Sequence, residues 1–261
     1  MSNCYRDLLA FATEVAWRAG RLTLAHFQTG IVAETKPDDS PVTEADRDAE
    51  RLIRDLIGRR FPHDGILGEE TGETRPGADR RWIVDPIDGT RSYVRGVPLY
   101  GVMLALEEEG DPVLGLLHFP ALAETVSAAR GVGCWWNGRR ALVSDETHLE
   151  RALVLTTDLG HIEQAGFSRG WNRLSARAGM VRTWGDCYGH ALLATGRAEA
   201  MLDPVMQLWD AAALVPIVEE AGGVITGWGE DADWRGGSVV ATSAALANDV
   251  RELLHQDRSE H

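Results

Sequence analysis

The sequence predicts a mixed α/β protein, layered from helices and sheets, in two halves that pack as one body. Apolar residues recur at helical spacing over the first 60 residues and change to period-two alternation after residue 99. After residue 150, strand-like runs alternate with helical segments. We therefore expect an N-terminal α+β half with an antiparallel sheet, residues 1–145, and a C-terminal α/β half, residues 146–261.

Two helices are expected at the start of the N-terminal half. Five apolar residues at helical spacing predict the first of them: Leu8, Phe11, Val15, Ala19 and Leu22. Thr43 is the predicted N-cap of the second helix, and Asp46 stands where a capping box would prefer Glu. Behind it, five residues form one apolar face: Ala49, Leu52, Ile53, Leu56 and Ile57.

The strands of this half follow the helices. Residues 82–84 read as a short buried strand, which we expect Pro86 to end. Three runs separated by turn residues predict an antiparallel meander: residues 99–106, 113–119 and 124–129. Residues 129–140 then read as a hairpin, with Asn137 and Gly138 as its turn.

The C-terminal half is expected to alternate strands and helices. Strands are predicted in residues 151–158, 180–184, 199–204 and 236–243. Helices are predicted over residues 161–178, from about Asp186, from about Trp209 to a stop at Gly222 and Gly223, and over 247–256. Pro216 lies inside the third of these, where an interior proline costs about 3 kcal/mol. That helix either kinks there or has an irregular first turn.

Charge and composition exclude several classes of protein. The 261 residues carry a formal net charge of −14, which disfavours nucleic acid as a partner. A small anionic substrate stays possible if a metal reverses the local field. The three cysteines form no C-x-x-C pair, acidic residues interrupt the apolar N-terminus, and no apolar stretch reaches membrane-spanning length. We expect a cytoplasmic protein with no membrane contact.

Acidic residues in three separated segments are candidates for a metal site: "GEE" at 68–70, "DPIDGT" at 85–90 and "WDAAA" at 209–213. Carboxylates without His or Cys partners suit Mg²⁺. Two such ions about 4 Å apart would clamp the attacking and leaving oxygens in phosphoryl transfer. Pro86 would let Asp85 and Asp88 face one point, and a short helix starting at Gly89 and Thr90 would seat an anion.

Ordinary structural explanations exist for the same residues. D-P-x-D-G is also common turn chemistry. Asp46 and Asp210 could each be a charge that favours a helix terminus. Lys36, in a turn-rich loop, would by default be a solvated surface lysine.

Taken together, these segments resemble the inositol monophosphatase superfamily of magnesium-dependent phosphatases. The resemblance runs through "VTEADRDAE", "GEE", "WIVDPIDGTRSYV" and "WDAAALVPIVEEAGG". Within the superfamily, residues 93–98 and 182–204 are most similar to histidinol-phosphatases. The resemblance implies an α-β-α-β-α sandwich, a homodimer, and hydrolysis of the small phosphorylated metabolite L-histidinol phosphate in histidine biosynthesis. Inositol 1-phosphate, fructose 1,6-bisphosphate and 3′-phosphoadenosine 5′-phosphate are the alternative substrates.

The resemblance also implies roles for individual residues. Two or three Mg²⁺ ions would be held by Glu69, Asp85, the carbonyl of Ile87, Asp88 and Asp210. Thr90, held by Asp46, would with Glu69 orient and activate the attacking water. The N–H groups of Gly89 and Thr90 would bind phosphate, and Lys36 would lie near the metals.

Substrate choice is assigned to residues within the same segments. Asp186 and Asp203 are the candidates for the amine and imidazole of histidinol phosphate, although Asp186 could merely cap a helix and Asp203 merely end a strand. Arg95 would contact the active site or a partner subunit, or be an ordinary surface arginine. We expect Trp184 and Tyr188 to lie in the core.

Two further hypotheses stay open beside the leading one. Arg91, Arg95 and Arg182 could supply the extra positive charge that a sugar diphosphate or a nucleotide needs. A non-catalytic regulator of this fold that binds a protein or RNA is the rival of a different class. The complete acid set and Thr90 argue against such a regulator, and the net charge argues against RNA.

Overall fold

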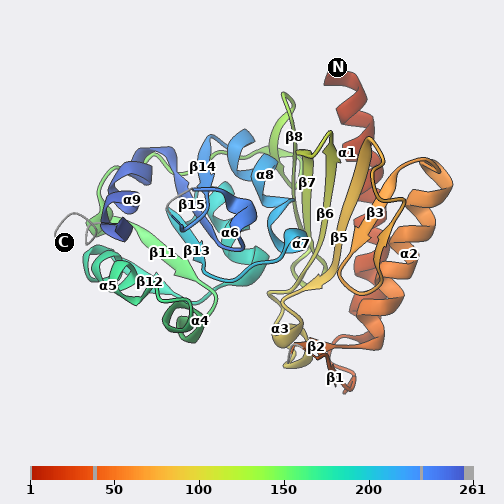
Figure 1. Cartoon of the computed structure of the whole chain (residues 1–261), viewed down its shortest axis with the longest axis horizontal. Helices are drawn as coiled ribbons and strands as arrows, with labels where there is room; N and C mark the ends of the chain where they lie inside the picture. The colour runs from red at the N-terminus through yellow and green to blue at the C-terminus, as the bar shows by residue number, and fades with distance from the viewer. Residues whose placement is uncertain (1, 38–39, 230–231, 256–261) are drawn as a thin grey trace.

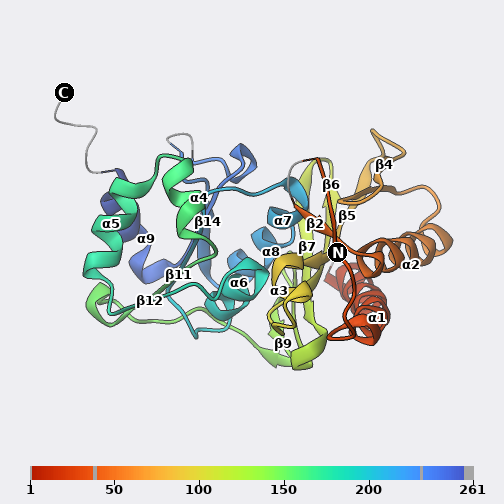
Figure 2. The same ribbon diagram turned by 90° about the horizontal axis from the view of Figure 1, so that it is seen from below.

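The computed structural model describes residues 2–37, 40–229 and 232–255, and it has five layers (Figure 1). Helices α1 (Ser2–His26) and α2 (Glu44–Arg60) cover the outer face of an eight-stranded sheet. Helices α6 (Asp186–Ala194) and α8 (Leu214–Glu220) lie between this sheet and a five-stranded one. Figure 2 shows the same order of layers from below. The expected α-β-α-β-α sandwich is confirmed.

The eight-stranded sheet has the order β10-β9-β8-β7-β6-β5-β3-β4. Its strands are β3 (Gly65–Gly68), β4 (Gly72–Thr74), β5 (Arg80–Asp88), β6 (Gly101–Glu108), β7 (Asp111–Phe119), β8 (Glu124–Ala129), β9 (Gly133–Trp136) and β10 (Arg139–Arg140). Only β3 and β5 pair in parallel. The predicted meander and hairpin are confirmed, and the hairpin turns at Asn137 and Gly138 with φ of 47° and 77°.

Strand β5 does not end at Pro86, which corrects one prediction. It continues to Asp88, and its pairing shifts: Asp85 faces Met103, whereas Asp88 faces Gly101. The step from Asp85 to Asp88 covers three residues of β5, whereas the opposite step from Met103 to Gly101 covers two residues of β6. A bulge of this kind accommodates a proline, which has no N–H to give to the ladder, and it bends the strand and re-aims its side chains.

The five-stranded sheet has the order β12-β11-β13-β15-β14. Its strands are β11 (Leu153–Thr156), β12 (Met180–Arg182), β13 (Ala200–Asp203), β14 (Gly223–Thr226) and β15 (Val239–Ser243). The sequence did not predict β14 in this sheet, or β3 and β4 in the other. Because β10 and β11 belong to different sheets, the change between sheets falls within the segment that joins them; the division at residue 145 stays a prediction.

Two helices predicted as single are each interrupted. The predicted 161–178 helix consists of α4 (Leu159–Gln164) and α5 (Ser168–Arg177), separated by Gly166 at φ 78°. The 209–221 helix consists of α7 (Leu208–Ala211) and α8, so Pro216 falls in the first turn of α8, where a missing N–H is tolerated.

The remaining elements are short or terminal. They are β1 (Glu34–Thr35), β2 (Pro41–Val42), α3 (Thr90–Val94) and α9 (Ala247–His255). The predicted last helix extended to Gln256, which lies outside the described residues. Among the described helices, none combines the length and apolar character that crossing a membrane requires.

The apolar faces predicted for α1 and α2 pack into one core against the eight-stranded sheet, where Val15, Ala49 and Ile53 are buried. A second core fills the space between the sheets, with Met103, Ala213 and Ile217 among its buried residues. Its tight packing places α7 and α8 directly on β6 and β7, and this contact positions Asp210 relative to β5.

Gly115→Ala tests that contact. A Cβ at Gly115 of β7 would overlap the carbonyl oxygen of Ala213, where α7 gives way to α8. Overpacking against backbone should lower the free energy of unfolding by about 1–3 kcal/mol. The matched control is Gly58→Ala in α2, where a Cβ meets no atom within 4 Å; it should stabilise by about 0.5–1 kcal/mol. Equal stabilities of the two variants in urea titrations would contradict this packing.

Candidate metal-dependent active site

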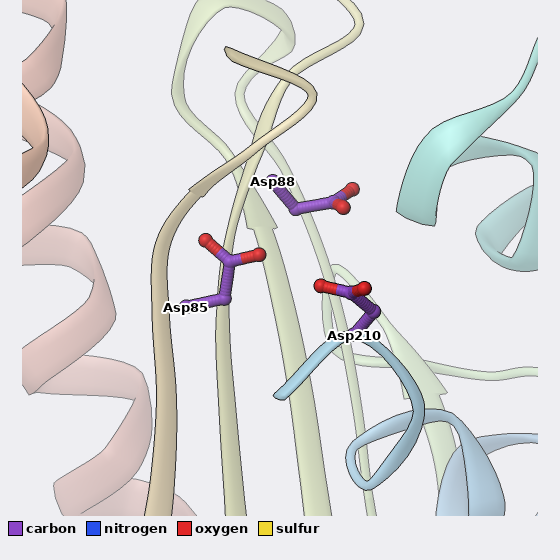
Figure 3. A group of neighbouring side chains, drawn as sticks. All are labelled: Asp85, Asp88 and Asp210. Carbon is purple, nitrogen blue, oxygen red and sulfur yellow. The ribbon is translucent and has the colours of Figure 1, made fainter. Parts of the chain in front are cut away.

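Three aspartates form the centre of the site. One carboxylate oxygen from each of Asp85, Asp88 and Asp210 lies within 4.8 Å of the other two (Figure 3). The bulge of β5 provides the first two, and the first turn of α7 provides the third. Segments far apart in the sequence are thus brought to one point.

Each of these carboxylates is fixed by a backbone amide. Asp85 Oδ1 accepts from Ile87 N at 3.0 Å, and Asp88 Oδ2 accepts from Cys187 N at 2.6 Å. Asp210 Oδ2 accepts from Gln207 N at 2.8 Å, which closes a capping box at the start of α7. The backbone therefore holds the three charges in place despite their mutual repulsion.

The pKa values of the three acids show the cost of this arrangement. Burial, and then the charges of Glu69, Asp88 and Asp210, raise the pKa of Asp85 well above its usual range. Burial and neighbouring aspartates likewise raise the pKa of Asp88, and burial raises that of Asp210 to about 7. A hard divalent cation would relieve both effects, and an all-oxygen donor set suits one. The residues present fit Mg²⁺.

Glu69 and Lys36 border the cluster. Glu69 follows β3 directly, and its N–H donates to the carbonyl of Val84 in β5 at 3.1 Å. Lys36 Nζ lies 2.7 Å from both Glu69 Oε1 and Glu70 Oε1. Burial alone would lower the pKa of Lys36, but the bonds to these two carboxylates raise it overall. Lys36 is thus not a solvated surface lysine.

Thr90 stands between Asp46 and the carbonyl of Ile87. Its Oγ1 lies 3.3 Å from Asp46 Oδ1 and 2.9 Å from the carbonyl oxygen of Ile87. Asp46 is fully buried and its other oxygen accepts from Thr43 N at 2.8 Å, so the predicted capping box is confirmed. Gly89 precedes Thr90 with φ 80°, which favours glycine. The Thr90 hydroxyl therefore reaches two acceptors with one proton.

A cavity of about 350 Å³ opens beside the acidic cluster, and Asp88 and Asp210 form part of its wall. Asp186 and Asp203 also line it, and so do Arg91 and His161. Burial, and then the charge of Asp203, raise the pKa of Asp186 to about 6. A substrate whose reacting group met the cluster would extend toward these two carboxylates.

Asp203 is held by two donors. His190 Nε2 lies 3.1 Å from its Oδ2, and Thr157 N lies 3.3 Å from its Oδ1. A carboxylate only accepts, so Nε2 of the fully buried His190 carries the proton. Neither contact was evident in the sequence: Thr157 belongs to no motif, and although His190 lies within residues 182–204, only the fold brings both residues to Asp203.

The sequence profile of the inositol monophosphatase family matches residues 5–261. The chain belongs to this family. As a member of it, the chain is a phosphatase, a hydrolase of phosphoric monoesters. A solved structure titled as an IMPase of Thermotoga maritima superposes with a TM-score of 0.87 at 31% identity and covers 96% of this chain and 97% of its own.

Curated relatives in the family agree with the branch that the sequence resembles. A protein named histidinol-phosphatase from Chlorobaculum parvum is 50% identical over 216 residues, covering 82% of this chain and 83% of its own length. Another of that name, from Mycobacterium tuberculosis, is 38% identical over 255 residues, covering 95% and 98%.

Some residues singled out in the sequence lie apart from the site. Arg95 is exposed and is not among the described residues that line the cavity. Trp184 is 42% exposed beside Arg182, so its predicted place in the core is wrong; it precedes α6 in a loop. Tyr188 packs against the core edge-on to Phe119, with ring centroids 5.1 Å apart.

Stability should depend on pH with a definite sign when no divalent cation is bound. Because the folded state raises the pKa of Asp210 from 3.8 to about 7, it binds more protons than the unfolded state between these values. The melting temperature in EDTA should therefore fall as pH rises from 4 to 7, and Mg²⁺ should restore it most near pH 7 and above.

Asp210→Asn separates this effect from general loss of stability. Its amide oxygen still accepts from Gln207 N, but the charge is gone. In EDTA at pH 7.5 the variant should melt at least about 2 °C above the wild type, whereas its response to Mg²⁺ should shrink. A variant that melted lower in EDTA yet responded normally to Mg²⁺ would argue against a shared ion.

Proposed function

We propose that the protein is a Mg²⁺-dependent phosphomonoesterase that hydrolyses L-histidinol phosphate to L-histidinol and phosphate, a step of histidine biosynthesis. One observation carries the proposal: the acidic cluster opens into a cavity that is also lined by two further carboxylates, the partly buried Asp186 and the buried Asp203. The names of the two curated relatives support the same substrate. The proposal includes a homodimer, as the sequence resemblance implies, and a cytoplasmic location, as the sequence analysis expects.

Asp85, Asp88 and Asp210, with Glu69 and the carbonyl of Ile87, would hold two or three Mg²⁺ ions. Bound Mg²⁺ would neutralise the charge of the phosphate ester and lower the pKa of the attacking water. The chain supplies the geometry, because backbone amides already fix the three aspartates before any ion arrives.

Thr90 and Glu69 would orient the attacking water. When the Thr90 hydroxyl donates a hydrogen bond to Asp46 Oδ1, a lone pair of its Oγ1 can accept a hydrogen bond from water. Glu69 would accept a hydrogen bond from the other O–H of that water, and the bond that Lys36 Nζ donates to Glu69 Oε1 at 2.7 Å would hold this carboxylate in place. The N–H groups of Gly89 and Thr90 would bind the phosphate, since α3 starts at Thr90 and its first amides have no partner within the helix.

Asp186 and Asp203 would select the leaving group. Histidinol carries an ammonium and an imidazole, and both can donate to carboxylates. Among the described residues, Ser92 Oγ is the hydrogen-bond partner of Asp186 Oδ2, at a long 3.3 Å, so this oxygen keeps lone pairs for a ligand. Inositol offers hydroxyl groups and no cation, so it would gain less from two acids in this place.

A phosphate-release comparison tests the substrate. With Mg²⁺ present, kcat/KM for L-histidinol phosphate should exceed that for inositol 1-phosphate by about 10²-fold or more, because a site built around charged hydrogen bonds rejects ligands that lack them. Fructose 1,6-bisphosphate and 3′-phosphoadenosine 5′-phosphate complete the panel. Turnover of inositol 1-phosphate with none of histidinol phosphate would defeat the substrate assignment and leave the phosphatase class standing.

Asp88→Asn tests whether catalysis is the function. The amide oxygen can still accept from Cys187 N, so folding should persist. Loss of one charge from the cluster should lower kcat by about 10²–10³-fold. Asp111→Asn at the exposed start of β7 is the matched control and should keep full activity. If cells that need the protein grew normally with the inactive Asp88 variant, a non-catalytic role would replace the proposed one.

A further inference from the structure

Glu50 of α2 is fully buried. Every described partner of its carboxylate is a hydrogen-bond donor. Oε2 accepts from the N–H of Glu70 at 2.7 Å, and Oε1 accepts from Arg54 Nε at 2.7 Å and from the N–H of Thr71 at 3.2 Å. Thr71 Oγ1 also donates to Oε1. Burying a carboxylate is costly unless it is paired in this way, so the arrangement calls for a reason.

Apart from Arg54, which lies on α2 itself, the donors belong to the turn that carries Glu69. The N–H of Glu69 goes to the carbonyl of Val84 in β5, one residue before Asp85. The next two N–H groups along the chain go to Glu50. Three consecutive amides are thus anchored, the first to the strand of Asp85 and the others to the helix of Asp46. Gly68 completes the contact, because a Cβ there would overlap the Glu50 carboxylate.

Strand β3 itself does not need this anchor. At its other end the buried Asp64 accepts from Arg80 Nη2 at 2.9 Å and from Trp82 Nε1 at 3.0 Å, both side chains of β5. The pairing of β3 with β5 provides the rest. Glu50 therefore acts on the turn after the strand, which leads from Gly68 to Gly72 and contains Glu69.

We propose that Glu50 is a positioning residue for the metal site. It fixes the turn so that Glu69 faces Asp85, and it ties this turn to the helix that holds Asp46 and, through it, Thr90. This inference rests on the metal-dependent function proposed above. Glu50 contacts neither substrate nor ion, so its effect should appear first in the binding of the cation and only through that in turnover.

Glu50→Gln compared with Asp64→Asn tests the proposal. Each replaces a buried carboxylate at one end of β3 by an amide, and both should lower the melting temperature. Only Glu50→Gln should weaken Mn²⁺ binding, followed by electron paramagnetic resonance, by about 10–100-fold. The Mg²⁺ concentration for half-maximal phosphate release should rise in parallel, with KM for the ester near the wild-type value at saturating Mg²⁺. Equal Mn²⁺ affinities for the two variants would overturn the proposal.

A milder pair covers the case in which Glu50→Gln does not fold. Thr71 is exposed, so Thr71→Val removes one donor to Glu50 without stranding a buried charge, and Thr71→Ser keeps that donor. Mn²⁺ should bind about 2–5-fold more weakly to the valine variant only, the loss expected for about one hydrogen bond; equal affinities of the pair would contradict the proposal. Since Mn²⁺ binding is measured without substrate, the test holds even if histidinol phosphate is not hydrolysed.

Discussion

Repulsion between buried carboxylates is the constraint on which the rest of the site depends. Asp85, Asp88 and Asp210 lie close enough to share one ion, and burial together with neighbouring charge raises the pKa of each. The surrounding structure opposes the separation of these charges. The bulge in β5, the capping box of α7 and the amide of Cys187 each hold one of them in place. A divalent cation bound among the three carboxylates would therefore relieve their repulsion.

The two sheets contribute different parts of the site. The eight-stranded sheet and α2 position Asp85, Asp88, Glu69 and Asp46, to which the proposed function assigns the cation and the water. The C-terminal segment, which includes the five-stranded sheet, positions Asp186 and Asp203 in the wall of the same cavity and also supplies Asp210 to the acidic cluster. Both halves of the chain therefore meet at this site.

The sequence predicted the layered fold and most strands because hydrophobic periodicity is local, as in the 99–106 and 113–119 runs. The prediction failed where the effect of a residue on the backbone depends on the elements that pack or pair with it. Pro86 was expected to end a strand, yet pairing with β6 carries β5 past it through a bulge. Gly166 separates α4 from α5, whereas the break between α7 and α8 leaves Pro216 in the first turn of α8. The acid motifs were visible in the sequence, whereas the contacts of Glu50 and His190 were not, although both residues lie within segments that carry the family resemblance.

A crystal structure determined with Mn²⁺ in place of Mg²⁺ tests the central claim most directly. The anomalous signal of manganese locates the ion independently of the protein atoms. We expect a peak between β5 and α7, with oxygens of Asp85, Asp88 and Asp210 as its ligands. Carboxylates that turned away from one another, with no anomalous peak among them, would contradict the account.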